Sequence, residues 1–318
     1  MNNYWSEYTI KEKVPVKSPL SGHDCFDIIP TKYTTNPNRS YKGKLLSSIK
    51  NLIKKLTSLG IRTPNLYYDK KNDFGFYPRP SEEFIAKYYA ALGKSHSDSL
   101  QMSQSISMAM TADEMINWVE KQTSVIKADS HVVDVGAGSG WMALALINRT
   151  KNVVAADLAI TDIEHIRGLN DKIVLEIMEN FWNSKQKFDL VFAIDMVEHL
   201  SKPLTFVQNL NKKVRKGGYV FISVPNFNSY FSKVHLGMHP YVSYPAHLNY
   251  FTVKSLSNLL LEGGFKVISC KTMTYPNEFE YVSRAYPKSI HECTSWDLMD
   301  KMLEQENGEH AIILASKV

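Results

Sequence analysis

Residues 131–141 read HVVDVGAGSGW, and this stretch is the clearest indication of the fold in the sequence. The apolar run His131–Val135 has the length and composition of a buried strand. Directly after it, glycines recur at every second position, at Gly136, Gly138 and Gly140, and a helical pattern follows at once. A strand that ends in glycines and leads into a helix N-terminus forms a turn whose backbone can approach a nucleotide or a nucleoside closely.

The alternation of short apolar strands with helical segments continues to the end of the chain. Six further strands are predicted, at Val153–Ala156, Ile173–Met178, Phe188–Ala193, Tyr219–Val224, Phe265–Cys270 and His310–Ala315. Apolar strands that alternate with helices predict an α/β fold, in which a mostly parallel sheet is covered by helices on both faces.

The composition is that of an ordinary globular protein. Of 318 residues, 44% are hydrophobic and 22% are charged, so the chain can bury a core without a disulfide or a structural metal. Its three cysteines are scattered, which excludes a disulfide framework and a cysteine-rich zinc module. No apolar run reaches the roughly 20 residues of a membrane helix, and no secretory signal opens the chain, so we expect a cytoplasmic protein.

The charge pattern bears on the partners. The net charge is +5, and the lysines are spread along the chain rather than gathered on one face. We therefore expect no nucleic-acid partner, and the lack of a long apolar run indicates no membrane partner. The oligomeric state stays open.

Asp157 comes at the end of the second strand of this fold. A carboxylate at that position can accept hydrogen bonds from both hydroxyls of a ribose. A dinucleotide fingerprint would place its third glycine where this chain has Trp141, which disfavours an NAD-dependent oxidoreductase. The glycine loop and the acid one strand later together indicate a nucleoside site at the carboxyl edge of the sheet.

The run Val133–Gly140 resembles the first motif of class I S-adenosylmethionine-dependent methyltransferases, and Asp157 matches the ribose-binding acid of that family. Three later stretches resemble further motifs of the family, at Phe188–Leu200, Arg215–Ser223 and His247–Phe265. The resemblance covers roughly residues 105–275 and the last strand. It implies a Rossmann-like seven-stranded sheet whose last strand is antiparallel, and S-adenosylmethionine as the cofactor.

Carried onto this sequence residue by residue, the resemblance also implies a cofactor site. The three glycines would line the methionine and ribose of the cofactor, Asp134 would orient the loop or the amino group, and Asp157 would hold the ribose diol. Phe181 has two interpretations, packing on the adenine or packing in the core. The remaining positions implied to contact the cofactor are Ala137, Ser139, Leu158, Asn180 and Asp195. Where the family usually has an Asp on the adenine side, this chain has Glu179 and Asn180.

Two stretches could activate the methyl acceptor. Asp195, Glu198 and His199 are spaced to share one face of a helix, where they could bind Mg²⁺, Mn²⁺ or Zn²⁺. Alternatively, His199 acts as a base without a metal. His247 lies in a long aromatic segment that resembles a substrate lid, or it caps the helix beginning near Thr252. We predict Glu198, His199 and His247 as the catalytic residues, and no metal.

The chain is predicted to divide near residue 95. Residues 1–95 would form a small accessory region of irregular structure, and residues 96–318 the methyltransferase domain. Within that domain, residues 226–250 are predicted to be a lid-like insertion and residues 277–308 a further insertion.

The accessory region has a fainter resemblance of its own. Some methyltransferases, including sugar-modifying ones, begin with a small zinc ribbon that ends in a Pro-Arg-Pro-Ser-Glu-Glu run. Gly75–Glu83 matches that run, but Ser18 and Ser21 stand where two of the ribbon's cysteines would be. We therefore expect a ribbon remnant that cannot form a thiolate zinc site.

The resulting prediction is a methyltransferase that uses S-adenosylmethionine. The acceptor would be an oxygen or nitrogen atom of a small molecule, such as a saccharide, a nucleotide sugar or a secondary metabolite. The alternatives are methylation of an RNA or a protein, and a catalytically silent scaffold of the same fold. Methylation of DNA base amines is disfavoured, because no Asn/Asp-Pro-Pro-aromatic motif follows the fourth strand.

Overall fold

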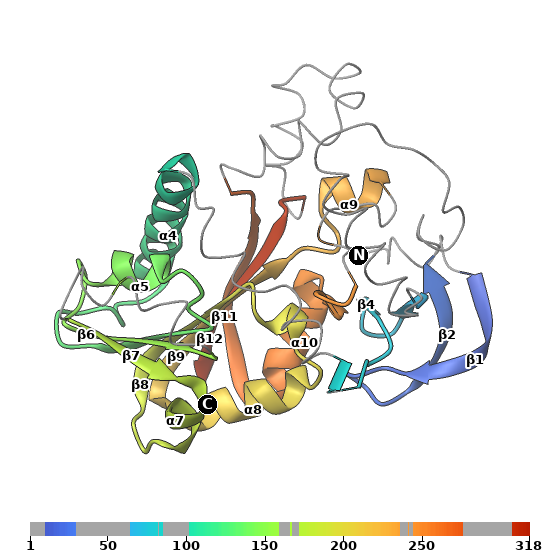
Figure 1. Ribbon diagram of the computed structural model, residues 1–318, viewed down its shortest axis with the longest axis horizontal. Coiled ribbons are helices and arrows are strands. Elements are labelled where there is room, and N and C mark those ends of the chain that lie inside the picture. Colours follow the sequence, from blue (N-terminus) through green and yellow to red (C-terminus); the bar gives the residue numbers. More distant parts are fainter. Residues whose placement is uncertain are drawn as a thin grey trace.

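The structure is a computed structural model, and it describes residues 10–29, 64–81, 83–84, 102–158, 166, 172–235, 241, 244–275 and 307–318. These residues form two sheets and the helices that pack on them (Figure 1). In this part of the chain, none of the helices combines the length and the apolar character needed to cross a lipid bilayer.

The larger sheet holds seven strands: β5 (His131–Val135), β6 (Asn152–Asp157), β7 (Ile173–Ile177), β8 (Phe188–Ile194), β9 (Val214–Pro225), β11 (Phe265–Met273) and β12 (His310–Lys317). Their order across the sheet is β11-β12-β9-β8-β5-β6-β7. The neighbours from β9 to β7 are parallel, whereas β12 runs antiparallel to both β9 and β11. This confirms the predicted seven-stranded, mostly parallel sheet with an antiparallel last strand.

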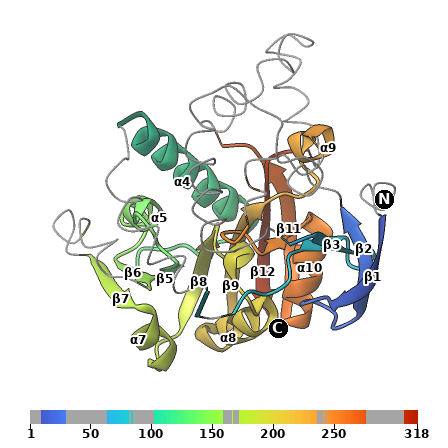
Figure 2. The same cartoon turned by 45° about the vertical axis from the view of Figure 1, so that its right-hand side comes forward.

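Helices cover both faces of this sheet (Figures 1 and 2). One face carries α4 (Met102–Gln122) and α5 (Trp141–Leu146), and the other carries α7 (Met178–Asn183), α8 (Pro203–Lys213) and α10 (Val253–Glu262). The strand residues alternate accordingly: Val132 and Phe192 pack in one hydrophobic cluster with Met115 of α4, and Val133 packs in the other with Leu256 of α10. Apolar side chains at every position are what a strand buried on both faces requires.

A smaller antiparallel sheet lies beside α10. In spatial order its strands are β1 (Ile10–Lys17), β2 (Asp24–Ile29), β3 (Leu66–Asp69), β4 (Phe74–Phe76) and β10 (Asn249–Tyr250). Phe74 and Phe76 pack in the same hydrophobic cluster as Leu256. The described part of the N-terminal region is therefore a regular sheet and not the irregular structure expected from the sequence, and β10 comes from far along the chain.

Hydrogen bonds to Asp69 hold together the turns that resemble a ribbon remnant. The carboxylate of Asp69 accepts from the hydroxyl of Ser21 at 2.8 Å and from the side-chain amide of Asn72 at 2.8 Å. The backbone N–H of Lys71 also donates to it, at 3.1 Å. A carboxylate thus joins the turn after β1 to the turn after β3.

The first of the two predicted insertions begins at the carboxyl edge of the larger sheet. The first, residues 226–250, follows β9 and contains α9 (Tyr230–His235), which lies above that edge in Figure 1. Most of the second, residues 277–308, lies outside the described residues, as do residues 85–101 around the predicted domain boundary. The lid role and the domain division therefore stay predictions.

Candidate functional site

The glycine loop connects β5 to α5 at the carboxyl edge of the parallel strands. Gly136, Gly138 and Gly140 have φ values of 77°, 52° and 74°, in the region where a Cβ is strained. A Cβ at Gly136 would lie 3.1 Å from Cγ of Met196, and one at Gly140 would lie 2.5 Å from Cδ1 of Ile166. At Gly138 the nearest atom of the described residues would be 4.0 Å away. The loop is therefore packed at both ends and open at its middle.

Two carboxylates flank this loop. The backbone N–H of Gly138 donates to Oδ2 of Asp157 at 2.8 Å, and the N–H of Ala137 donates to the carbonyl of Ala156 at 3.1 Å, so the loop is fixed onto the end of β6. Asp134 is buried within β5, and burial raises its pKa to about 7, with the charge of Asp157 adding to the rise. A cationic ligand at the loop would relieve this repulsion.

The edge beside β6 and β7 carries the other predicted cofactor positions. Leu158 is 83% exposed, and Asn180 is exposed at the start of α7. Phe181 is fully buried, with its ring centroid 4.7 Å from that of Trp182 and 5.9 Å from that of Phe188. Because no part of Phe181 reaches the surface, the structure favours the core interpretation of this residue over stacking on an adenine.

The chain after β8 does not form the helix expected over Asp195–His199. Asp195 has a φ of 49°, and its N–H donates to the carbonyl of Ser223 at 2.9 Å. Only Val197–His199 form a short 3₁₀ helix, η3. The expectation of one helical face shared by Asp195, Glu198 and His199 is therefore wrong, because Asp195 lies in the bend between β8 and η3, outside any helix.

Asp195 pairs instead with a residue that the sequence analysis missed. Its Oδ1 lies 3.2 Å from Nε2 of His310, the first residue of β12. The His310 ring is buried and stacks on Tyr275 with a centroid distance of 3.8 Å. The hydroxyls of Tyr275 and Ser223 are 2.7 Å apart. The one available signal was that a histidine opens the last strand, at the sheet edge where ligands bind.

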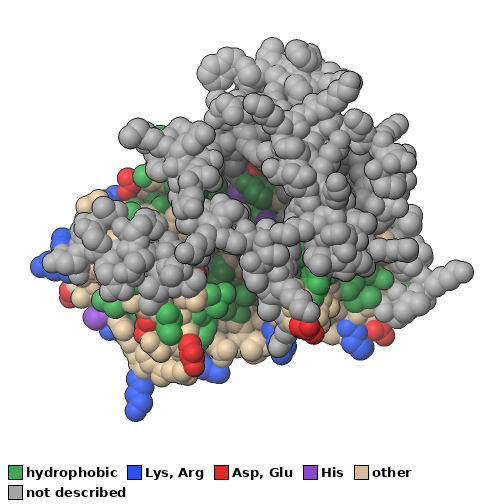
Figure 3. Space-filling model, in the orientation of Figure 1, with side chains coloured by type: hydrophobic (Ala, Val, Ile, Leu, Met, Phe, Trp, Pro, Cys, Tyr) green, Lys and Arg blue, Asp and Glu red, His purple; other side chains and the backbone are tan. Residues whose placement is uncertain are grey.

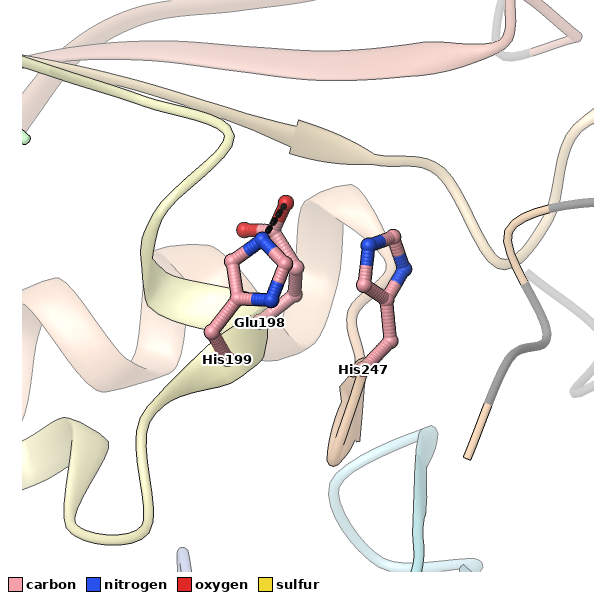
Figure 4. A group of neighbouring side chains, drawn as sticks. All are labelled: Glu198, His199 and His247. Atoms are coloured by element: carbon pink, nitrogen blue, oxygen red, sulfur yellow. Dashed lines mark ion pairs between the residues drawn. The ribbon is translucent and has the colours of Figure 1, made fainter. Parts of the chain in front are cut away.

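Glu198, His199 and His247, all predicted as catalytic, lie together in the structure (Figure 4). One ligand atom of each residue lies within 4.8 Å of those of the other two. Glu198 is 1% exposed, and neither of its carboxylate oxygens accepts a hydrogen bond from the described residues. Burial raises the pKa of Glu198 well above its usual range, and the charge of Asp195 adds to the rise. The group is a buried acid beside two imidazoles.

The two imidazoles are held in defined orientations. Nδ1 of His199 lies 2.7 Å from the carbonyl oxygen of Ala246, so it is Nδ1 that carries the proton and donates. The rings of His199 and His247 meet edge to face, with centroids 4.6 Å apart. The Tyr241 ring lies 6.1 Å from that of His247 and 5.5 Å from that of His310, so it links the two histidine groups.

Asn249 stabilises the η3 segment through its side chain. The sequence alone did not indicate this role. The buried side-chain amide of Asn249 donates to the carbonyl oxygens of Val197, Glu198 and Leu200 at 3.1, 3.1 and 2.8 Å. Its Oδ1 accepts from Nη2 of Arg79 at 2.5 Å. A guanidinium from the N-terminal region therefore helps to hold the segment that presents Glu198 and His199.

The two halves of the site adjoin. Met196, which directly precedes η3, packs against Gly136 of the glycine loop. Histidine side chains are visible in a hollow in the middle of the face that Figure 3 shows. A ligand bound on the glycine loop would therefore lie next to the imidazoles.

Comparison with known proteins identifies a matching family and two similar sequences. The profile of a family described as a methyltransferase domain matches residues 109–270. A ubiquinone biosynthesis O-methyltransferase from Leptothrix cholodnii is 31% identical over 122 residues, which make up 36% of this chain and 51% of that protein. A mitochondrial ubiquinone biosynthesis O-methyltransferase from Dictyostelium discoideum is 32% identical over 124 residues, 33% of this chain and 38% of that protein. The chain thus spans about half the length of the first relative and less of the second.

One solved structure extends the comparison to the fold. A magnesium protoporphyrin IX methyltransferase from Synechocystis PCC 6803, crystallised with S-adenosylhomocysteine, has a TM-score of 0.50 and 12% identity, and it covers 75% of this chain and 100% of its own. At this identity the likeness shows a shared fold. Since the family profile matches half of the chain and the seven-stranded sheet agrees with it, the chain belongs to the class I S-adenosylmethionine-dependent methyltransferases.

Proposed function

We propose that this protein transfers a methyl group from S-adenosylmethionine to a hydroxyl oxygen of a small molecule. The observation that carries the proposal is the position of Glu198, His199 and His247 next to the glycine loop. A hydroxyl is a poor nucleophile until its proton is removed, whereas many amines need no such help. A cluster of two imidazoles and a carboxylate at this place therefore supports an oxygen acceptor over a nitrogen acceptor.

The residues around the glycine loop fit the cofactor. The open middle of the loop at Gly138 leaves room for the methionine and ribose. Asp157 would accept the ribose hydroxyls, and Asp134 would attract the positively charged amino group. Leu158 and Asn180 would flank the adenine from the exposed edge beside β6 and β7.

The reaction needs a methyl donor and a site for a proton. S-adenosylmethionine, held by the glycine loop and Asp157, would supply the methyl group on a cationic sulfur. As the acceptor oxygen bonds to that carbon, the carbon–sulfur bond would break and its electron pair would stay on sulfur, which gives S-adenosylhomocysteine. The acceptor proton would pass to the His199–His247 group, where Glu198 balances the added positive charge. The segment of residues 226–250 would help to exclude water from the acceptor.

Calorimetric titration with S-adenosylhomocysteine tests the cofactor half of this proposal. We expect micromolar binding by the wild-type protein and at least tenfold weaker binding by Asp157→Ala, because hydrogen bonds to a charged group each contribute about 1.5–3 kcal/mol. Asp129→Ala removes an exposed carboxylate before β5 and should bind as the wild type does. Absence of binding by the wild-type protein would contradict the proposal.

The acceptor half is tested by methyl transfer from labelled S-adenosylmethionine to matched alcohols and amines. We expect label on the hydroxyl compounds, and a large loss of kcat in His199→Gln with S-adenosylhomocysteine binding retained. Label on the amines alone would contradict an oxygen acceptor. Cofactor binding without transfer to any acceptor would support the scaffold alternative instead.

A further inference from the structure

We propose that Asp195, held in place by His310, attracts the positively charged sulfur of S-adenosylmethionine and makes the site prefer this methyl donor over the neutral product, S-adenosylhomocysteine. Asp195 would contact the cofactor, and His310 would act through Asp195 as a positioning residue. The inference rests on the proposed function, since it needs a cofactor whose sulfur is charged. It gives a role to the Asp195–His310 pair, which the proposed proton transfer does not use.

The first argument is the support behind Asp195. Its N–H donates to the carbonyl oxygen of Ser223 at 2.9 Å, and its Oδ1 lies 3.2 Å from Nε2 of His310. The His310 ring stacks on that of Tyr275 at a centroid distance of 3.8 Å, and the hydroxyls of Tyr275 and Ser223 are 2.7 Å apart. These four contacts form a closed ring at the ends of β9 and β12, which lie side by side (Figure 1). All its members except Asp195 are buried, so the ring holds the carboxylate in one orientation.

The second argument is the open side of the Asp195 carboxylate. Oδ1 is buried next to His310, yet 39% of the Asp195 side chain is exposed. The exposed part is therefore the side that carries Oδ2. The backbone at Asp195 has a φ of 49°, a conformation that is uncommon for residues other than glycine and recurs at ligand sites. A carboxylate with one oxygen engaged and the other open can bind a ligand through the second oxygen.

The third argument is the position of the pair between the two halves of the site. Met196, the next residue, packs against Gly136 of the glycine loop. On the other side, burial is the main cause that raises the pKa of Glu198, and of the nearby charges that of Asp195 raises it further and that of His310 lowers it. The methyl group has to pass from a cofactor on the glycine loop to an acceptor beside Glu198. The sulfur that carries it would therefore lie at this boundary.

The charge of Asp195 determines which form of the cofactor it favours. S-adenosylmethionine has a positive charge on sulfur and S-adenosylhomocysteine has none, whereas the amino acid tail, the ribose and the adenine are common to both. A carboxylate beside the sulfur therefore attracts the donor alone, and near a protein surface this attraction is stronger than in bulk water. Once the methyl group has been transferred the attraction is lost, so the product would leave more readily.

Calorimetric titration of the full chain with S-adenosylmethionine and, separately, with S-adenosylhomocysteine tests the pair without an acceptor. We expect the wild-type protein to bind S-adenosylmethionine at least about fivefold more tightly. Asp195→Asn and His310→Phe should each remove most of this preference by weakening S-adenosylmethionine binding, with S-adenosylhomocysteine affinity retained within about twofold. The phenylalanine can still stack on Tyr275 but has no ring nitrogen. His310→Gln, whose amide can donate to Asp195, should recover part of the preference.

Two controls separate this effect from a general loss of charge or structure. Asp189→Asn is the matched variant, because Asp189 also pairs with a cation, Arg215 at 2.7 Å, but lies at the opposite end of β8. It should leave the preference unchanged, and Asp157→Asn should weaken binding of both cofactor forms equally.

The outcomes distinguish the inference from the proposed function. An unchanged preference in Asp195→Asn, or an equal loss of affinity for both cofactor forms in that variant, would overturn the inference. A loss of preference in Asp195→Asn with the wild-type preference in both His310 variants would overturn the positioning role of His310. Binding of neither cofactor form by the wild-type protein would instead overturn the proposed function.

Discussion

The two halves of the site differ in how the chain builds them. The proposed cofactor half lies within one contiguous unit, from β5 through the glycine loop to Asp157. The proposed acceptor half draws on four separate segments, which contribute Arg79, η3, Asn249 and His310. A local unit depends on its own backbone conformation, whereas an assembled one depends on contacts between distant parts. Changes to remote residues should therefore disturb the acceptor half and spare the cofactor half.

The largest effect is expected at Asp134. Its pKa is about 7 in the folded protein, against 3.8 as the reference value for the unfolded chain. The folded state therefore binds more protons between these values, and the free energy of unfolding falls as the pH rises from about 4 to about 7. Asp134→Asn should remove this fall in the free energy of unfolding. A pKa difference of about three units corresponds to a fall on the order of 4 kcal/mol. Urea denaturation at several pH values measures the difference.

The control for this prediction is Asp157→Asn, which removes the neighbouring charge but leaves the buried carboxyl. Because burial is the main cause of the raised pKa and Asp157 the lesser one, this variant should retain most of the pH dependence. A stability difference between wild type and Asp134→Asn that does not change with pH would contradict the assignment.

The next largest effect is expected on cofactor binding, from a substitution in the glycine loop. Gly136→Val forces a β-branched residue to a φ of 77° and places its Cβ 3.1 Å from Met196. Left-handed strain of about 1–2 kcal/mol and crowding of similar size should weaken S-adenosylhomocysteine binding by about 100-fold. Gly217→Ala is the matched control, because Gly217 has a φ of 75° and, among the described residues, no atom lies within 4 Å of an added Cβ. Equal binding by the two variants would count against a cradle at Gly136.

The same contrast explains what the sequence could predict. The glycine loop and Asp157 were predictable because strand, turn and helix signals are local. Asp195 was wrongly assigned to a helix because spacing alone cannot tell where the helix begins, and a left-handed bend at Asp195 separates β8 from η3. His310 was missed because its partner, Asp195, lies after a different strand, far away in the sequence. Contacts between distant segments leave no periodic signal in either segment.

The smaller sheet and the aromatic residues show the same limit. Strand β10 has two residues, too few for an alternating pattern, and it becomes a strand only because β4 offers it a partner. The two interpretations of Phe181 could not be separated from sequence, since an aromatic ring suits a ligand site and a core equally. Its burial between Trp182 and Phe188 in the folded chain favours the core interpretation.

The smallest effect is expected on the free energy of unfolding, from changes to the residues that hold η3. Asn249→Ala removes the donor for three carbonyls of the η3 segment and the acceptor for Arg79, and should lower the free energy of unfolding by about 2 kcal/mol. Arg79→Met should cost about 1 kcal/mol, and the double variant less than the sum, because both changes break one network. S-adenosylhomocysteine affinity should stay within about twofold in all three variants, since the glycine loop makes none of these contacts. Additive losses, or a loss of cofactor affinity equal to that of Gly136→Val, would show that the two halves are not built independently.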